Sequence, residues 1–122
     1  VERIYGEHIS DRTNWRAMLK GEVALLDLER KRDEMLDQCM AEITALQNVH
    51  GIHAIQPLHD SKVLAIEYPV IQYPTKVVSH NLDKTPDVEG VLLGIKGQYL
   101  ILDTGVINLR KFTSYQIELS SE

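Results

Sequence analysis

Cations and aromatic rings gather in the second half of the sequence, where together they offer the chemistry of nucleic-acid binding. Rings can stack on bases while cations pair with phosphates, a combination that small β-barrels use to hold single strands. The same rings are also good strand residues, so packing is the competing interpretation. From their clustering about two expected turns, we predict that five residues contact nucleic acid: Lys96, Tyr99, Asn108, Arg110 and Lys111.

The overall charge gives this hypothesis no general support. The chain carries 13 Lys and Arg against 18 Asp and Glu, for a net charge of −5. A protein that holds nucleic acid over its whole surface is usually basic. Any contact with nucleic acid must therefore use a local patch.

Side-chain alternation assigns faces to the last expected strand. Asn108 and Arg110 alternate with Ile107 and Leu109, and successive strand residues point to opposite faces. We expect Ile107 and Leu109 to face the core. Asn108 and Arg110 would then lie on the other face, flanked by Tyr99.

Three histidines are candidate metal ligands, but their pattern is weak. His50, His53 and His59 fall around Gly51, where a helix is expected to end. No cysteine or carboxylate completes a known ligand spacing. We predict no metal site and no cofactor.

Nucleophilic catalysis finds little support in the sequence. Cys39, the single cysteine, falls inside a helical pattern, where a small buried residue is expected. A lone cysteine excludes an internal disulfide and fits a reducing, cytoplasmic setting. No serine occupies a nucleophile elbow, and the glycines do not follow the dinucleotide order. We predict no catalytic residue, and no activity in this chain alone.

The first half of the chain is helical by pattern. A short helix is expected at about residues 11–20, capped by Ser10 or Asp11, and a long amphipathic helix at about 22–48. A helix of about 27 residues would be about 40 Å long, more than so small a globule needs. We expect it to break near residues 29–34, or to pack against another chain or an upstream segment.

The second half is rich in β-branched and aromatic residues, with Pro69 and Pro74 marking edges or bends. Five or six short antiparallel strands are expected there, closed into a small barrel or a bent sheet. The fold class is therefore α+β, with a helical segment at residues 1–51 and a β domain at 52–122 that share one core. No apolar run approaches the about 20 residues of a membrane span, so no membrane partner is expected.

Three stretches carry a family resemblance: "SDRTNWRAML", "EYPV" and "GIKGQYLILDTGVINLRKFTSYQIEL". They resemble the C-terminal half of an uncharacterised bacterial family, domain-of-unknown-function family 2797. The resemblance implies a longer parent protein, with an upstream segment similar to GIY-YIG nucleases. Glu2 would then match the helical glutamate that binds the catalytic metal in that superfamily. The family often has glycine where this chain has Ser114, which leaves a turn at that point open.

Three functions follow from these observations. The first is an accessory domain that contacts nucleic acid. The second is a protein-interaction or self-association module, which the unusually long helix expected at about 22–48 supports. Its partner would be another copy of the chain or the upstream segment. The third is the C-terminal half of a metal-dependent, nuclease-like enzyme.

Overall fold

The computed structural model describes residues 1–10 and 12–121 and shows two compact units that interleave along the sequence. The helical unit comprises Val1–Thr13 and Ala24–Ala65, and the β unit comprises Asn14–Val23 and Ile66–Glu122. Asp11, one of the two expected helix caps, lies outside the described residues. The division at residues 51 and 52 with a shared core stays a prediction.

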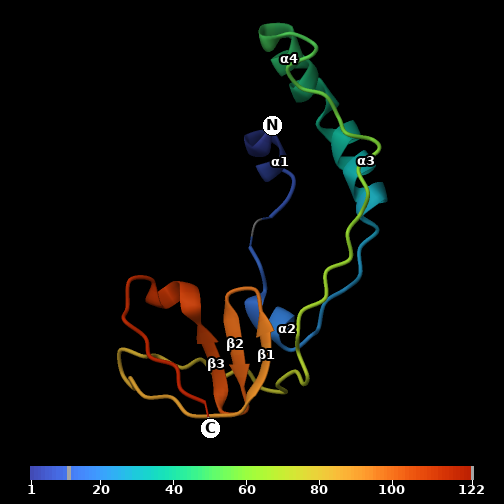
Figure 1. Cartoon of the computed structure of the whole chain (residues 1–122). Helices are drawn as coiled ribbons and strands as arrows, with labels where there is room; N and C mark the ends of the chain where they lie inside the picture. Colours follow the sequence, from blue (N-terminus) through green and yellow to red (C-terminus); the bar gives the residue numbers. More distant parts are fainter. Residues whose placement is uncertain (11, 122) are drawn as a thin grey trace. The chain divides into compact units, whose positions relative to one another are not determined.

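The helical unit contains α1 (Glu2–Gly6), α3 (Leu28–Gln38) and α4 (Met40–His50) (Figure 1). The expected helix over 22–48 is thus shorter and divided. It begins at Leu28 because the Asp27 carboxylate caps it, accepting a hydrogen bond from the Arg30 backbone N–H at 3.0 Å. It breaks at Cys39, whose φ of −97° and ψ of 7° leave the helical region, and not near residues 29–34.

In the β unit, α2 (Trp15–Leu19) is shorter than the expected helix over 11–20. Its start is set by Asn14, whose side-chain oxygen accepts a hydrogen bond from the Ala17 backbone N–H at 3.2 Å. Gly21 follows its end with a φ of +75°, a conformation that glycine adopts without strain. None of the described helices is long and apolar enough to cross a membrane.

Three antiparallel strands form one sheet in the order β1-β2-β3. They are β1 (Leu92–Lys96), β2 (Tyr99–Leu102) and β3 (Gly105–Asn108), followed by the 3-10 helix η1 (Leu109–Phe112). The α+β class is confirmed. The sheet is open, so the predicted closed barrel is not supported.

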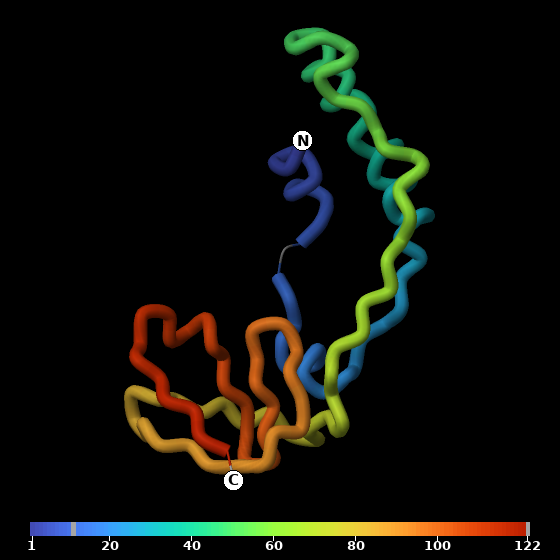
Figure 2. Tube along the Cα trace, viewed as in Figure 1, coloured from blue at the N-terminus to red at the C-terminus, as the bar shows by residue number. Residues whose placement is uncertain are grey.

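Two further segments lie along the edges of the sheet without forming full strands. Val70 bridges Gly94 on β1, and Ser79 bridges Val106 on β3. The pairing stays short beside Pro69, because a proline has no N–H to donate to a ladder. The chain therefore crosses from one edge of the sheet to the other between residues 70 and 79, which Figure 2 traces in yellow.

The core of the β unit lies between the sheet and α2. Leu19 of α2 packs with Tyr99, Ile101 and Val106, and these four side chains are at most 9% exposed. Trp15, Met18, Val70, Val77 and Leu93 pack around them.

The expected core face of the last strand is wrong. Val106 is fully buried, whereas Ile107 is half-buried and Leu109 is 41% exposed. The physical reason is that α2 covers the opposite face of β2 and β3. Leu109 also lies beyond the strand, in η1, where the alternation of a strand no longer applies. Ser114 adopts a φ of +73°, so the chain does turn at the position where the sequence left a turn open.

Gly94 provides a test of this packing. A Cβ at this position would lie 2.8 Å from Val70 Cα, a backbone atom that cannot move away cheaply. We expect Gly94→Ala to lower the free energy of unfolding by about 1–3 kcal/mol. Urea unfolding followed by fluorescence of Trp15, the only tryptophan, measures this in the β unit.

Gly97→Asn is the control, because Gly97, whose φ is +57°, has open space around it. Asparagine tolerates that conformation, so the loss should stay below about 1 kcal/mol. Equal stabilities of the two variants would contradict the close approach of Val70 and Gly94.

Candidate functional site

The ammonium of Lys96 is buried among aromatic rings and backbone. Lys96 is only 8% exposed, and its Nζ donates to Met18 O at 3.0 Å and to the Tyr73 hydroxyl at 3.3 Å. The same Nζ lies 4.8 Å from the Tyr73 ring centroid and 5.8 Å from that of Tyr68. Cation–π attraction and the carbonyl together offset the loss of water around the charge. This ammonium is therefore engaged inside the β unit.

Tyr99 is likewise committed to packing. Its ring stacks on Trp15 with centroids 6.0 Å apart and planes 4° apart, and it is 9% exposed. The Arg16 guanidinium carbon lies 4.3 Å from the Trp15 ring centroid, a cation–π contact within α2. The stack of Trp15 on Tyr99 fastens α2 to β2. It leaves little of the Tyr99 ring for a ligand.

The other three predicted contact residues lie at the end of β3. The Asn108 side-chain oxygen accepts from the Arg110 backbone N–H at 3.2 Å and from Gln98 Nε2 at 2.9 Å, so Asn108 caps η1. Arg110 and Lys111 are both exposed on η1. Because they lie on a 3-10 turn, the strand rule that sends neighbours to opposite faces does not separate them.

The five predicted residues thus have different environments. Lys96 and Tyr99 are buried, Asn108 caps a turn, and Arg110 and Lys111 remain exposed. Contact with nucleic acid stays a prediction, and the exposed pair is the part of the set that a phosphate could reach.

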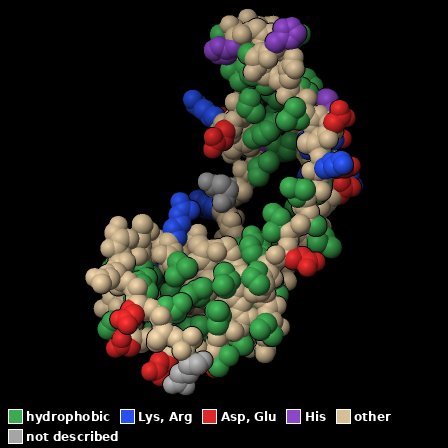
Figure 3. Space-filling model, in the orientation of Figure 1, with side chains coloured by type: hydrophobic (Ala, Val, Ile, Leu, Met, Phe, Trp, Pro, Cys, Tyr) green, Lys and Arg blue, Asp and Glu red, His purple; other side chains and the backbone are tan. Residues whose placement is uncertain are grey.

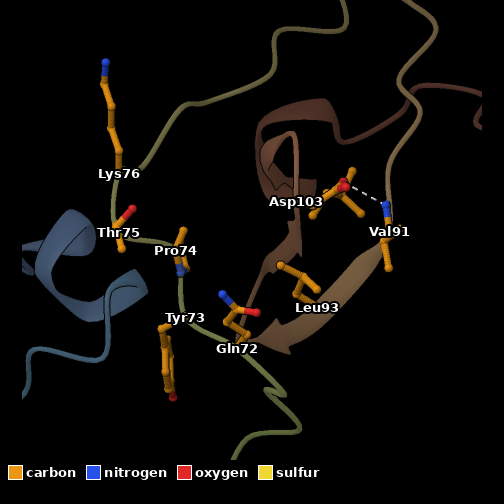
Figure 4. A pocket seen from close by; sticks show the side chains of 9 residues that line it. Gln72, Tyr73, Pro74, Thr75, Lys76, Val91, Leu93 and Asp103 are labelled. Carbon is orange, nitrogen blue, oxygen red and sulfur yellow. Dashed lines mark hydrogen bonds between the residues drawn. The ribbon is translucent and has the colours of Figure 1, made fainter.

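A hollow of about 450 Å³ lies beside the sheet (Figure 4). It is lined by Gln72, Tyr73, Pro74, Thr75, Lys76, Val91, Leu93, Leu102 and Asp103. Figure 4 shows the Lys76 side chain pointing away from Asp103, whose Oδ1 accepts from the Val91 backbone N–H at 2.8 Å. No sequence motif pointed to this hollow, and its one carboxylate is already engaged in holding a loop.

Neither the candidate metal ligands nor the single cysteine is placed in an assembled site in residues 1–10 and 12–121. No group of three or more His, Cys, Asp or Glu side chains is placed there to hold a metal ion. His53 Nδ1 lies 3.0 Å from Gln56 Nε2, and Glu2 is exposed on α1. Burial raises the pKa of the Cys39 thiol, which disfavours the reactive thiolate.

The helical unit differs from the β unit in how few apolar side chains it buries. Among its described residues, Cys39 and Ile43 are buried, while many large apolar side chains are exposed, which Figure 3 shows in green. Five of them flank the base of α3 and are here called the apolar stem: Leu25, Leu26, Leu28, Val63 and Leu64. Leu25 is fully exposed and Leu64 is 79% exposed.

The two sides of the apolar stem belong to chain segments that run beside one another. Arg32 Nη1 of α3 donates to His59 O of the returning chain at 3.2 Å, and Figure 2 shows that chain following α3 back. Of the stem residues only Leu28, which begins α3, is helical, and none is in a strand. Sequence reasoning placed residues 25–28 in a helix and so missed this surface.

The charges of α3 are divided along its length. Its first half carries Glu29 and then Arg30, Lys31 and Arg32, and its second half carries Asp33, Glu34 and Asp37. Glu34 pairs with Lys31 Nζ at 2.6 Å and with Arg30 Nε at 3.1 Å. The hydrogen bond from Lys31 lowers the pKa of Glu34, and that from Arg32 lowers the pKa of Asp33.

The contacts of Lys96 lead to a prediction about stability. Lys96→Met keeps much of the volume but leaves Met18 O and the Tyr73 hydroxyl without their donor. We expect a loss of about 1–3 kcal/mol in the free energy of unfolding, measured by urea unfolding with Trp15 fluorescence. Lys76→Met, at an exposed position, is the matched control and should change stability by less than about 0.5 kcal/mol. A Lys96→Met variant as stable as this control would show that the buried ammonium is not structurally required.

Comparison with known proteins places the chain in a family. The family model described as "Protein of unknown function (DUF2797)" matches residues 1–117, which include most of both units. No curated protein and no solved structure matches the chain. The resemblance noted from three stretches of the sequence is thereby confirmed at the level of the family. The chain belongs to the DUF2797 family.

Proposed function

We propose that the chain is a self-association module whose helical unit packs against that of a second copy. The observation that carries this proposal is the exposure of the apolar stem, which belongs to a unit with few buried apolar residues. Exposed large apolar side chains gathered on two neighbouring chain segments are uncommon on proteins that stay monomeric. It is typical of surfaces that become buried in an interface.

The energetics of the stem favour a partner. Burying a leucine side chain is worth about 1.5–3 kcal/mol, and Leu25, Leu26 and Leu64 are all more than half exposed. Apart from Leu28, the first residue of α3, the stem residues form no helix or strand, so ordering them costs conformational entropy without much internal compensation. Association would supply the missing apolar contacts.

The proposal places the chain in a reducing compartment, the cytoplasm. The only cysteine, Cys39, is free and buried, and a chain with a single cysteine needs no oxidising environment for its fold.

Paired substitutions in the stem test self-association. We expect the wild-type chain to show a concentration-dependent rise in sedimentation coefficient. Leu25→Asp with Leu64→Asp should raise the dimer dissociation constant at least about tenfold, because carboxylates replace apolar groups at the interface. Ile71→Asp with Leu119→Asp is the matched control, since both side chains are 87–88% exposed in the β unit. A wild-type chain that stays monomeric at every concentration would overturn the proposal and assign the stem to a different partner.

Nucleic-acid contact is the second candidate function, and one observation favours it. Arg110 and Lys111 are exposed side by side on η1, with Lys111 Nζ 5.5 Å from the Phe112 ring centroid. Two adjacent cations on one turn can pair with neighbouring phosphates. Because Lys96 and Tyr99 are buried, stacking on Tyr99 is not part of this candidate.

Oligonucleotide binding at low salt tests this second candidate. If η1 contacts phosphates, Arg110→Ala with Lys111→Ala should weaken binding of a single-stranded oligonucleotide and reduce its salt dependence by about 1.4 units in log–log slope. Lys76→Ala with Lys84→Ala is the matched control, since it removes two exposed cations elsewhere in the β unit. Undetectable binding by the wild-type chain, or an equal effect of both pairs, would remove this candidate.

A further inference from the structure

Beyond its first turn, the order of charges along α3 departs from what an isolated helix favours. A helix carries partial positive charge at its N-terminus and partial negative charge at its C-terminus, so carboxylates are stabilising first and cations last. The Asp27 cap and Glu29 follow this rule, but Arg30, Lys31 and Arg32 come next, carboxylates occupy the second half, and the last turn holds no cation. The Arg30–Glu34 pair also has the weaker i,i+4 orientation, with the cation on the N-terminal side. From Arg30 onward, the charge order therefore does not serve the stability of the helix itself.

Local ion pairing does not use all of these charges. Glu34 accepts both Arg30 and Lys31, and Arg32 pairs with Asp33. These pairs are largely solvent-exposed, so they can exchange for other partners at little cost. Asp37 is exposed and is in none of the ion pairs found among the described residues.

We infer that α3 pairs in antiparallel orientation with α3 of a second copy, so that the cationic half of each helix faces the carboxylate half of the other. The inference rests on the proposed self-association and assigns its recognition element. A two-fold interface places residue i opposite j and j opposite i, which this charge order satisfies in both halves at once. A parallel pair would instead place cations against cations.

The register that aligns the charges also aligns exposed apolar residues. If Lys31 of one copy lies opposite Glu34 of the other, Arg32 lies opposite Asp33, and counting outward in the same register puts Leu25 opposite Met40. Leu25 is fully exposed and Met40 is 51% exposed. The charged centre would thus be flanked at both ends by an apolar contact from the stem.

The length of α3 limits what the helix can contribute to the proposed dimer interface. Its 11 residues are about 16 Å long, which is too short to supply the about 800 Å² per partner of a standard interface. The apolar stem must supply much of the buried area. The charges then select the partner and its orientation, which is the usual role of charged groups at an interface.

Charge exchange on α3 tests this inference in the whole chain. One variant, Arg30→Glu with Lys31→Glu and Arg32→Glu, makes α3 wholly acidic. Another, Asp33→Lys with Glu34→Lys and Asp37→Lys, makes it strongly basic and leaves Glu29 as its single carboxylate. By sedimentation, each should dimerise at least about tenfold more weakly than wild type, and an equimolar mixture should recover association as a heterodimer. Glutamate and lysine are both good helix formers, and circular dichroism checks that helicity is kept.

Two controls separate charge order from charge content. The six-residue exchange that combines both variants keeps the net charge and restores antiparallel complementarity, so it should dimerise as well as wild type. Lys76→Glu with Lys84→Glu and Lys111→Glu changes the net charge as the acidic variant does, but in the β unit, and should leave dimerisation unchanged. High salt, near 1 M, should weaken the wild-type dimer, because it shortens the Debye length to about 3 Å.

The outcomes distinguish this inference from the proposed function. If wild type dimerises and the acidic and basic variants do so equally well, self-association stands and the role of α3 is overturned. If wild type prefers the six-residue exchange variant as a partner over itself, the helices pair in parallel and the antiparallel arrangement is overturned. A wild-type chain that never associates overturns both.

Discussion

The β unit depends on one buried ammonium, that of Lys96, which joins three segments distant in sequence. Its Nζ binds the carbonyl of Met18 at the end of α2 and the hydroxyl of Tyr73 in the segment that crosses the sheet. A buried charge without these partners would be costly, so each segment must be in place for the others to be stable. The stack of Trp15 on Tyr99 then fastens the same helix to β2.

Contacts between segments distant in sequence limit how far the sequence could predict the structure. The α+β class, the turns at Gly97 and at residues 103–104, and the family followed from local patterns. The burial of Lys96 could not be predicted in this way, because it depends on Met18 and Tyr73, which local patterns do not connect to it. A lysine at the end of a strand is usually exposed.

The wrong prediction of which face of β3 is buried has a similar origin. Alternation groups residues by face but does not say which face is covered, and here α2 covers the side of Val106. The end of the long helix pattern was missed for a local reason: Asp27 caps α3, so Leu25 and Leu26 remain outside it. Helical periodicity continues through these leucines, yet a cap residue decides where the helix begins.

The two units therefore reach stability by different routes, and this difference constrains function. The β unit engages its most distinctive cation and ring, Lys96 and Tyr99, within its own core, so those groups stabilise the fold and are not free to bind a ligand. The helical unit has the opposite character, because its apolar side chains exceed what Cys39 and Ile43 can bury around them. Since apolar surface is stabilised wherever water is excluded from it, the helical unit gains more from an intermolecular contact than the β unit does. The part of the chain with the weaker internal core is thus the part best suited to recognising another protein surface.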